Sequence, residues 1–342
     1  MPPPARRTGD PDRVAGPPGA PHRRLGARAH PHRAGPDPRR RRGGRVTGEG
    51  VLRPSLAEHL RRAGLDPAGV VTVVRRALEE DLALGPDVTT ESTVPAGARS
   101  TGDVVPRSPG VLAGLPVAAA VFDLVGGRDV DVVLQASDGD AAVPGLAALS
   151  VTGPTRTLLT AERTALNLVC HLSGIATLTR AWVDAVAGTG AAIRDTRKTS
   201  PGLRALEKYA VRCGGGVNHR MALGDAALVK DNHVAAAGGI AQAVRAVRAH
   251  APGVPLEVEV DTLDQLREAV AAEVGLVLLD NFSLEDTRTA VSLVRGTGIR
   301  LEASGGLTLD RAHEVAETGV DHLAVGALTH SAPVLDLGFD LR

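Results

Sequence analysis

The sequence predicts an α/β protein with a C-terminal (β/α) barrel and a smaller N-terminal α+β sandwich domain. Beyond Gly188, six apolar strands alternate with helical segments through short connections, which is typical of a parallel sheet and, at this regular spacing, of a barrel. Apolar residues predominate in these strands, which fits burial on both faces. Before them, short β-branched runs are separated by Gly, Pro and Asp turns, which indicates a mixed α+β unit. We expect an incomplete barrel of about six or seven strands.

Residues 1–50 are predicted to be a disordered, Arg- and Pro-rich extension. The first 45 contain twelve Arg, three Asp and almost no large apolar side chains, so they cannot bury enough surface to fold. Because the chain has a formal net charge of +0, the remainder is acidic. Pro interrupts every apolar stretch that an export signal would need. A basic arm for RNA or lipid is the functional alternative.

Residues 51–163 are predicted to form the N-terminal domain, which begins with two helices. Ser55 and Glu58 fit a capping box at the start of the first helix, and residues 70–81 have helical spacing. Thr160 is expected to cap a long helix that ends near Trp182 and bridges the two domains. Short strands are expected between these helices, at residues 104–105, 130–134 and 149–152.

Residues 164–328 are predicted to form the barrel, and residues 329–342 to be a tail that packs on the N-terminal domain. The expected strands are 192–194, 226–229, 256–260, 276–279, 299–303 and 322–325. The expected helices are 203–212, 240–250, 263–272, 284–295 and 309–317.

Composition excludes several classes of protein. No run of 18 apolar residues occurs, so no transmembrane helix is expected, and a cytoplasmic protein is indicated. Cys170 and Cys213 lie far apart, which suggests neither a disulfide framework nor a thiolate metal site. Five aromatic residues in 342 leave few stacking platforms for bases, so nucleic acid is not an expected partner.

Three cationic clusters lie within about forty residues, at 195–199, 218–220 and 230–233. Arg forks bind carboxylates and phosphates through two points, so a small ligand with several negative charges is indicated. On the predicted barrel, polar residues and glycines occur at the C-terminal strand ends, where barrel enzymes assemble their sites. Two Gly-containing turns, 303–306 and 325–327, follow the last two strands and suit a phosphate.

Several longer blocks occur in one order. They are Glu162 to Asn167, Ser173 to Thr177, Asp195 to Thr199, Pro201 to Arg204, Lys208 to Val211, Gly214 to Arg220 and Lys230 to His233. Together they resemble the quinolinate phosphoribosyltransferases, the carboxylating nicotinate-nucleotide pyrophosphorylases. The resemblance runs from about Leu52 to the C-terminus, and residues 1–45 have no counterpart in it.

The resemblance implies a reaction of NAD biosynthesis. Quinolinate and phosphoribosyl pyrophosphate would give nicotinate mononucleotide, pyrophosphate and carbon dioxide, with Mg²⁺ on the pyrophosphate. It also implies a homodimer, or a higher oligomer, with shared active sites.

The resemblance assigns roles to particular residues. Substrate would be bound by Arg163 of a neighbouring subunit and by Thr196, Arg197, Lys198, His219, Arg220 and Lys230. The catalytic residues would be Lys198, Lys230, Glu259 and Asp280, the last two also serving the metal indirectly. Phosphate would lie on Ser304, Gly305, Gly306, Val325, Gly326 and Ala327. Carboxylates at the ribose would stabilise the positive charge that develops when pyrophosphate departs.

Other interpretations stay open. Lys230 at a strand end could serve a Schiff-base lyase. A paralogue could use another carboxylated heterocycle such as nicotinate. A non-catalytic nucleotide- or RNA-associated protein could use the basic arm. Glu257 lies on the same strand face as Glu259 and could take its place or orient it. Asn232 and His233 could form a capping turn.

Overall fold

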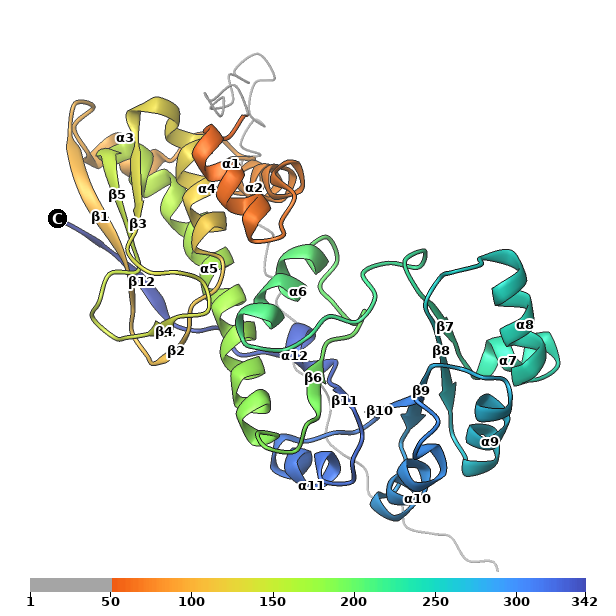
Figure 1. Cartoon of the computed structure of the whole chain (residues 1–342). Coiled ribbons are helices and arrows are strands. Elements are labelled where there is room, and N and C mark those ends of the chain that lie inside the picture. The colour runs from red at the N-terminus through yellow and green to blue at the C-terminus, as the bar shows by residue number, and fades with distance from the viewer. Residues whose placement is uncertain (1–50) are drawn as a thin grey trace, which may run out of the picture. The chain divides into compact units, whose positions relative to one another are not determined.

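The computed structural model describes residues 51–342, and the predicted disordered extension, residues 1–50, lies outside this part. Two arrangements of strands are present, an antiparallel sheet near the N-terminal helices and a set of parallel strands (Figure 1). A single long helix, α5 (Thr155–Ala185), contacts elements of both.

The N-terminal domain is a sheet covered on one face by helices. Its four antiparallel strands lie in the order β12-β1-β5-β3. Helices α4 and α5 contact the sheet, and α1 and α2 pack on those helices (Figure 1). The strands are β1 (Arg99–Pro106), β3 (Asp131–Leu134), β5 (Leu149–Pro154) and β12 (Leu337–Leu341), with β2 (Gly110–Val111) and β4 (Ala141–Ala142) paired separately. The helices are α1 (Pro54–Arg62), α2 (Pro67–Asp81), α3 (Val88–Thr93), α4 (Leu115–Gly126) and the 3-10 turn η2 (Gly127–Asp129).

The end of the chain completes this sheet. Strand β12 pairs antiparallel with β1, and Phe339 on it stacks on Phe122 of α4 with ring centroids 5.6 Å apart. The chain reaches β12 by crossing α5 at Gly174, where a Cβ would lie 2.1 Å from the carbonyl oxygen of Pro333. Only glycine permits this approach.

The starts of the first two helices differ from the sequence prediction. Helix α1 begins at Pro54, which presets the φ of the first turn, and Ser55 makes no cap, so the predicted capping box is wrong. The N–H of Arg53 instead donates to Asp123 Oδ2 at 2.9 Å. Helix α2 begins at Pro67 rather than Val70, because Asp66 accepts from two N–H groups of its first turn.

The long helix also begins earlier than predicted. Helix α5 starts at Thr155, directly after Pro154 ends β5, and continues to Ala185 rather than Trp182. Thr160 therefore lies inside the helix and does not cap it. Helix α4, which the sequence did not predict, has ten of its twelve residues buried. A helix that is apolar all round shows no amphipathic period from which to recognise it.

The C-terminal domain is an incomplete parallel barrel. Its six strands lie in the order β6-β11-β10-β9-β8-β7. Val217 forms a parallel bridge with Arg194 on the free side of β6, which gives a seventh strand position, and the prediction of six or seven strands is confirmed. The strands are β6 (Ala192–Arg194), β7 (Ala227–Val229), β8 (Leu256–Val260), β9 (Leu276–Asp280), β10 (Arg300–Ser304) and β11 (His322–Ala324).

Helices connect these strands. They are α6 (Arg204–Cys213), α7 (Asp231–Ala237), α8 (Ile240–His250), α9 (Leu263–Ala271), α10 (Leu284–Val294), η3 (Leu309–Arg311) with α11 (Ala312–Ala316), and α12 (Ala327–His330). The short helices α7 and α12 follow β7 and β11 directly and were not predicted.

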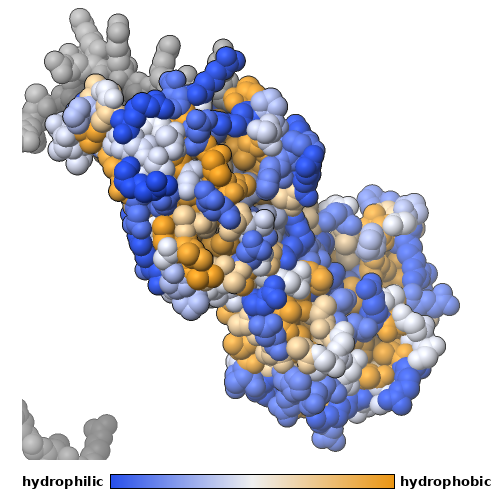
Figure 2. All heavy atoms as spheres, turned by 60° about the vertical axis from the view of Figure 1, so that its left-hand side comes forward, coloured by the Kyte–Doolittle hydropathy of each residue, from blue (hydrophilic) through white to orange (hydrophobic). Residues whose placement is uncertain are grey.

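The surface mixes charged and apolar residues (Figure 2). In the N-terminal domain, Val133 and Leu146 are among the exposed large apolar side chains. No helix within residues 51–342 combines the length and the apolar character that crossing a membrane requires.

Candidate active site

The predicted cationic residues come together at one edge of the barrel. The segment 196–198 follows β6, the segment 218–220 follows the bridge at Val217, and Lys230 follows β7. Because the carboxyl ends of parallel strands face the same way, these segments lie at one end of the barrel (Figure 1). Glu259, Asp280 and Ser304 lie at or near the ends of β8, β9 and β10 at the same edge.

Two arginines at this edge each have one buried donor, the Nε–H group, without an acceptor among the described residues. The Nε atoms of Arg197 and Arg220 are buried, and neither has a hydrogen-bond partner among the described residues. Arg220 Nη1 donates to the carbonyl oxygen of Ala226 at 2.9 Å. Burial, followed by the positive charge of Arg197, lowers the pKa of Arg220. Two guanidinium groups held close together in this way form a site suited to an anion with more than one carboxylate or phosphate group. They are named the arginine pair below.

A buried ion pair fixes the two segments that carry these arginines. Lys208 of α6 and Asp195, both fully buried, form a short salt bridge. Lys208 also donates to the carbonyl oxygen of His219 at 2.9 Å, and Asp195 accepts from the His219 N–H at 2.8 Å and from Asn218 Nδ2 at 2.5 Å. Asp195, Lys208 and Asn218 had no assigned site role in the sequence prediction, although all three lie in the blocks that carry the resemblance.

His219 has both ring nitrogens bonded to protein groups. Its Nδ1 accepts from the N–H of Arg220 at 2.6 Å, so the ring proton is on Nε2, which lies 3.0 Å from Glu257 Oε2. The side chain is 8% exposed. In this structure, the ring nitrogens of His219 are therefore bonded to the backbone of Arg220 and to Glu257, and neither is left for a substrate carboxylate.

The two glutamates of β8 have separate partners. Glu259 forms a short salt bridge with Lys230, whose side chain is 44% exposed against 15% for Glu259. Glu257 is buried and bonds to His219. Asp280 accepts from Asn281 Nδ2 at 2.9 Å. The structure therefore places Glu259, rather than Glu257, beside Lys230.

The turn after β10 is shaped by glycines and by Asn281. Gly305 and Gly306 both have positive φ, as does Asn281. A Cβ on Gly305 would lie 2.2 Å from Asn281 Oδ1, and the N–H of Asn281 donates to the carbonyl oxygen of Ser304 at 2.9 Å. The ends of β9 and β10 are thus locked together, which keeps Asp280 close to this turn.

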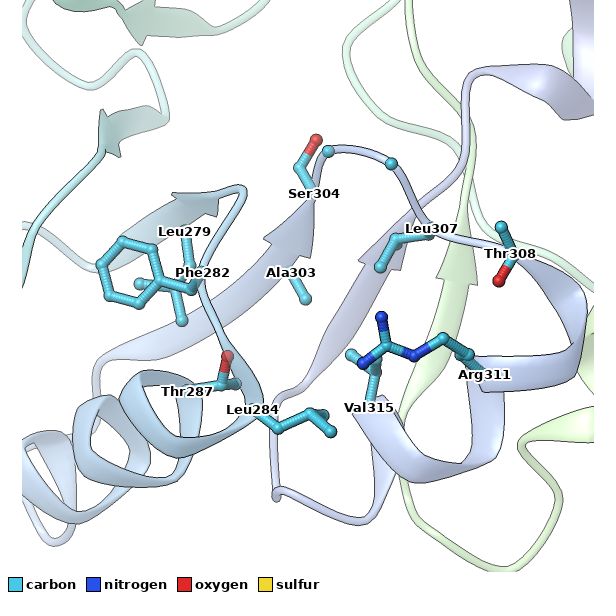
Figure 3. Close-up of a pocket in the computed structure, with 12 residues that line it drawn as sticks. Leu279, Phe282, Leu284, Thr287, Ala303, Ser304, Leu307, Thr308, Arg311 and Val315 are labelled. Carbon is cyan, nitrogen blue, oxygen red and sulfur yellow. The ribbon is translucent and has the colours of Figure 1, made fainter.

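A small hollow of about 70 Å³ lies behind this turn. Figure 3 shows Arg311 reaching toward it from η3, with Leu307 and Val315 close by and Ser304 at the end of β10. The hollow has a mixed lining, in which Ser304, Thr308 and Arg311 lie beside apolar side chains.

The turn after β11 closely approaches the lysine of the first segment. A Cβ on Gly326 would lie 2.9 Å from Lys198 Cδ and 3.4 Å from Thr196 Oγ1. Thr196 Oγ1 accepts from the N–H of Lys198 at 3.0 Å, and Thr329 Oγ1 donates to the carbonyl oxygen of Lys198 at 2.8 Å. The predicted phosphate turn and Lys198 are therefore neighbours.

Arg163 comes from α5 rather than from the ends of the barrel strands. It is exposed on α5, and no hydrogen bond or ion pair of its side chain is present in the described part of the chain.

The fold and the site define an enzyme of the α/β-barrel type that binds a multiply negative small molecule beside carboxylates. Models of the quinolinate phosphoribosyl transferase family match two regions, the N-terminal domain at residues 87–173 and the C-terminal domain at 175–340. The chain belongs to this family.

Similar proteins with a name support this membership. Nicotinate-nucleotide pyrophosphorylase [carboxylating] of Mycobacterium leprae is 60% identical over 78% of this chain and 95% of its own length. A probable enzyme of the same name from Bacillus subtilis is 42% identical over 77% of this chain and 90% of its own length. The solved nicotinate-nucleotide pyrophosphorylase of Francisella tularensis is 39% identical with a TM-score of 0.77, covering 80% of this chain and 96% of that one.

Proposed function

We propose that this protein transfers phosphoribosyl from phosphoribosyl pyrophosphate to quinolinate, giving nicotinate mononucleotide, pyrophosphate and carbon dioxide. The observation that carries the proposal is the arginine pair, whose two buried Nε donors have no acceptor within residues 51–342. A substrate with two adjacent carboxylates supplies such acceptors, because each guanidinium binds a carboxylate in a planar, two-point manner. Family membership supports the same substrate.

In this proposal the ring nitrogen of quinolinate bonds to C1 of the ribose as the bond from C1 to pyrophosphate breaks. Positive charge develops on the ribose, and Glu259 and Asp280 would stabilise it. Lys198 and Lys230 stabilise the negative charge of the leaving group. The adjacent carboxylate then leaves as carbon dioxide, and the carbanion at that ring carbon, stabilised by the cationic ring nitrogen, takes up a proton.

The turns 304–306 and 325–327 are proposed to bind the 5-phosphate. Gly326 supports this role because its lack of a side chain leaves room beside Lys198. Thr196 is proposed to hold the Lys198 segment through its bond to that N–H.

Mg²⁺ is proposed as the cofactor. Glu259 and Asp280 offer oxygen ligands, the type that Mg²⁺ prefers. Because Lys230 already pairs with Glu259, we infer that these carboxylates hold the ion chiefly through the substrate's pyrophosphate. When bound, the ion would neutralise charge on that leaving group.

We further propose a homodimer in which Arg163 completes the partner's site, together with a cytoplasmic location. The exposure of Arg163 on α5, without a hydrogen bond or ion pair in the described part of the chain, supports a role toward a second chain. The free thiols of Cys170 and Cys213 fit a reducing compartment.

Product analysis tests the reaction. The full chain is incubated with Mg²⁺, phosphoribosyl pyrophosphate and either quinolinate or nicotinate, and carbon dioxide and pyrophosphate are measured. Release of both products with quinolinate is expected. Turnover of nicotinate alone, or of neither, would overturn the proposal. Removal of residues 1–45 should leave the activity intact, since every proposed site residue lies between Arg163 and Ala327.

Mixing inactive variants tests the shared site. Arg163→Ala and Lys230→Ala, each inactive alone, should regain part of the activity after they are unfolded and refolded together, because hybrid dimers contain one intact site. No regain, with dimers shown by sedimentation, would exclude the shared site.

A further inference from the structure

A third arginine, Arg204, joins the two segments that carry the arginine pair. It is the first residue of α6 and is half-buried. Its Nε donates to Thr199 Oγ1 at 3.0 Å, and its Nη1 donates to the carbonyl oxygen of Met221 at 3.1 Å. Thr199 belongs to the segment after β6, whereas Met221 directly follows Arg220. One planar guanidinium group therefore bridges two segments that are separate in the sequence.

The Thr199 end of this bridge leads directly to Arg197. The N–H of Thr199 donates to the carbonyl oxygen of Arg197 at 3.0 Å, which closes a tight turn around Lys198. Because Arg204 holds the hydroxyl group of Thr199, it also restricts the place of this turn. The backbone that carries the guanidinium group of Arg197 is thereby fixed relative to α6.

The Met221 end of the bridge leads to Arg220 through a second turn. The carboxylate of Asp225 accepts from the N–H of Met221 at 2.6 Å and from the following N–H at 2.9 Å, which closes the exposed turn 221–225. The residue after Asp225 provides the carbonyl oxygen that accepts from Arg220 Nη1. The turn to which Arg204 donates therefore holds both the backbone beside Arg220 and the acceptor of its side chain.

The position of Arg204 is electrostatically unfavourable for the helix. A cation in the first turn of a helix opposes the helix dipole, and no carboxylate within residues 51–342 forms an ion pair with this guanidinium group. Burial lowers the pKa of the nearby Lys208, and the charge of Arg204 contributes to the same shift. Helix stability therefore does not explain an arginine here, whereas its two bonds to separate segments do.

We propose that Arg204 is a positioning residue that sets the spacing of the arginine pair for a substrate with two adjacent carboxylates. A dicarboxylate must meet both guanidinium groups at once, so its affinity depends on the distance between them. Without the bridge the two segments move independently, and the arginine pair is no longer preorganised for the substrate. The inference rests on the proposed function and adds a determinant of quinolinate affinity to it.

Steady-state kinetics of Arg204→Gln test the proposal. The variant loses the fork that reaches both segments, so KM for quinolinate should rise by about 10- to 100-fold. The kcat and the KM for phosphoribosyl pyrophosphate should change by no more than about threefold. Arg248→Gln is the matched control, because Arg248 of α8 also donates to two backbone carbonyl oxygens, those of Ala272 and Glu273. This control should keep the KM of the unmodified enzyme, and an equal KM in Arg204→Gln would overturn the inference.

Arg204→Lys separates the effect of the bridge from that of the charge. Lysine keeps the positive charge but lacks the rigid fork that reaches Thr199 and Met221 together, so KM for quinolinate should stay raised by about tenfold or more. Recovery of the KM of the unmodified enzyme would show that the charge alone attracts the dianion, and it would overturn the inference.

A double-mutant cycle tests the bond between Arg204 and Thr199. Thr199→Val should raise KM for quinolinate by itself, but it should add little in the Arg204→Gln background, because the bond is already absent there. Fully additive effects would contradict the bridge.

Hydrogen exchange tests the bridge without substrate. In the full chain, amide exchange in peptides that contain residues 196–199 and 219–226 should become faster by roughly threefold or more in Arg204→Gln and stay unchanged in Arg248→Gln. Thr199→Val, which removes one bond only, serves for the same measurement if Arg204→Gln does not fold. Unchanged exchange would overturn the inference whichever substrate the enzyme uses. The proposed function fails separately, if the unmodified enzyme does not convert quinolinate.

Discussion

Two groups of charge, one fully buried and one half-buried, involve the ends of β6 and the segment after Val217, and they differ in whether their donors and acceptors are bonded. Lys208 and Asp195 satisfy each other and also bind the backbone of His219. Arg197 and Arg220 each have a buried Nε with no acceptor in residues 51–342. The difference teaches that the first pair holds the framework, while the arginine pair keeps two donors open for the proposed substrate.

The largest effect is expected from Lys208→Met. It leaves the carboxylate of Asp195 buried without its counter-charge, which should lower the free energy of unfolding by about 3–5 kcal/mol. Urea denaturation followed by circular dichroism measures this change. Asp195→Asn combined with Lys208→Met should recover part of the loss. If the free energy of unfolding fell by less than about 1 kcal/mol, the Lys208–Asp195 pair would not hold the framework and would not differ from the arginine pair in this respect.

Arg197→Met should have the opposite effect, because it should lower the activity and not the stability. The variant removes one half of the arginine pair, so kcat/KM for quinolinate should fall by about 100- to 1000-fold. Its unfolding free energy should stay the same or rise, because the guanidinium has no bonded partner to lose in the described structure. Steady-state kinetics and denaturation measure both quantities, with Arg288→Met on the exposed face of α10 as control. A clear loss of stability would show that Arg197 holds the framework as well.

Glu259→Gln tests a pair that shares features of both groups. Glu259 is bonded to Lys230, as in the Lys208–Asp195 framework pair, yet it lies at the site, as the arginine pair does. Loss of its charge should lower kcat by about tenfold or more through weaker stabilisation of the ribose cation. KM for quinolinate should change little, because the arginine pair is untouched. A change confined to KM would place Glu259 on the carboxylate side of the substrate.

The smallest effect is expected from Gly326→Ala. The new Cβ would lie 2.9 Å from Lys198 Cδ, and this flexible side chain can move aside, so stability should hardly change. KM for phosphoribosyl pyrophosphate should rise several-fold, because the phosphate turn and Lys198 are displaced together. Gly275→Ala, where no atom lies within 4 Å of the added carbon, should leave the kinetics unaltered.

The regular part of the fold could be read from the sequence. Each predicted barrel strand is present within one or two residues, because a buried parallel strand is a short, mainly apolar run between turn residues. The wrong helix starts at Ser55 and Thr160 have a common cause, since each hydroxyl residue lies after a proline that begins the helix or immediately precedes it.

Elements defined by long-range contact were not predicted as a strand or a helix, although the tail 329–342 was expected to pack on the N-terminal domain. Strand β12 forms only because β1 offers it an edge, and α4 is buried on all sides. Their patterns reflect neighbours that are distant in the sequence rather than a local period.

The sequence by itself determined the order of strands and helices, the positions of the charged residues at strand ends and the blocks shared with the family. All of these are local, since periodicity and turn residues act over a few positions. Tertiary structure decided which charges are paired. Asp195 and Arg197 are two residues apart, yet one meets Lys208 in the interior and the other meets no partner among the described residues. Hydrogen bonds and burial depend on distances between segments, and the amino-acid order does not specify those distances until the barrel has formed.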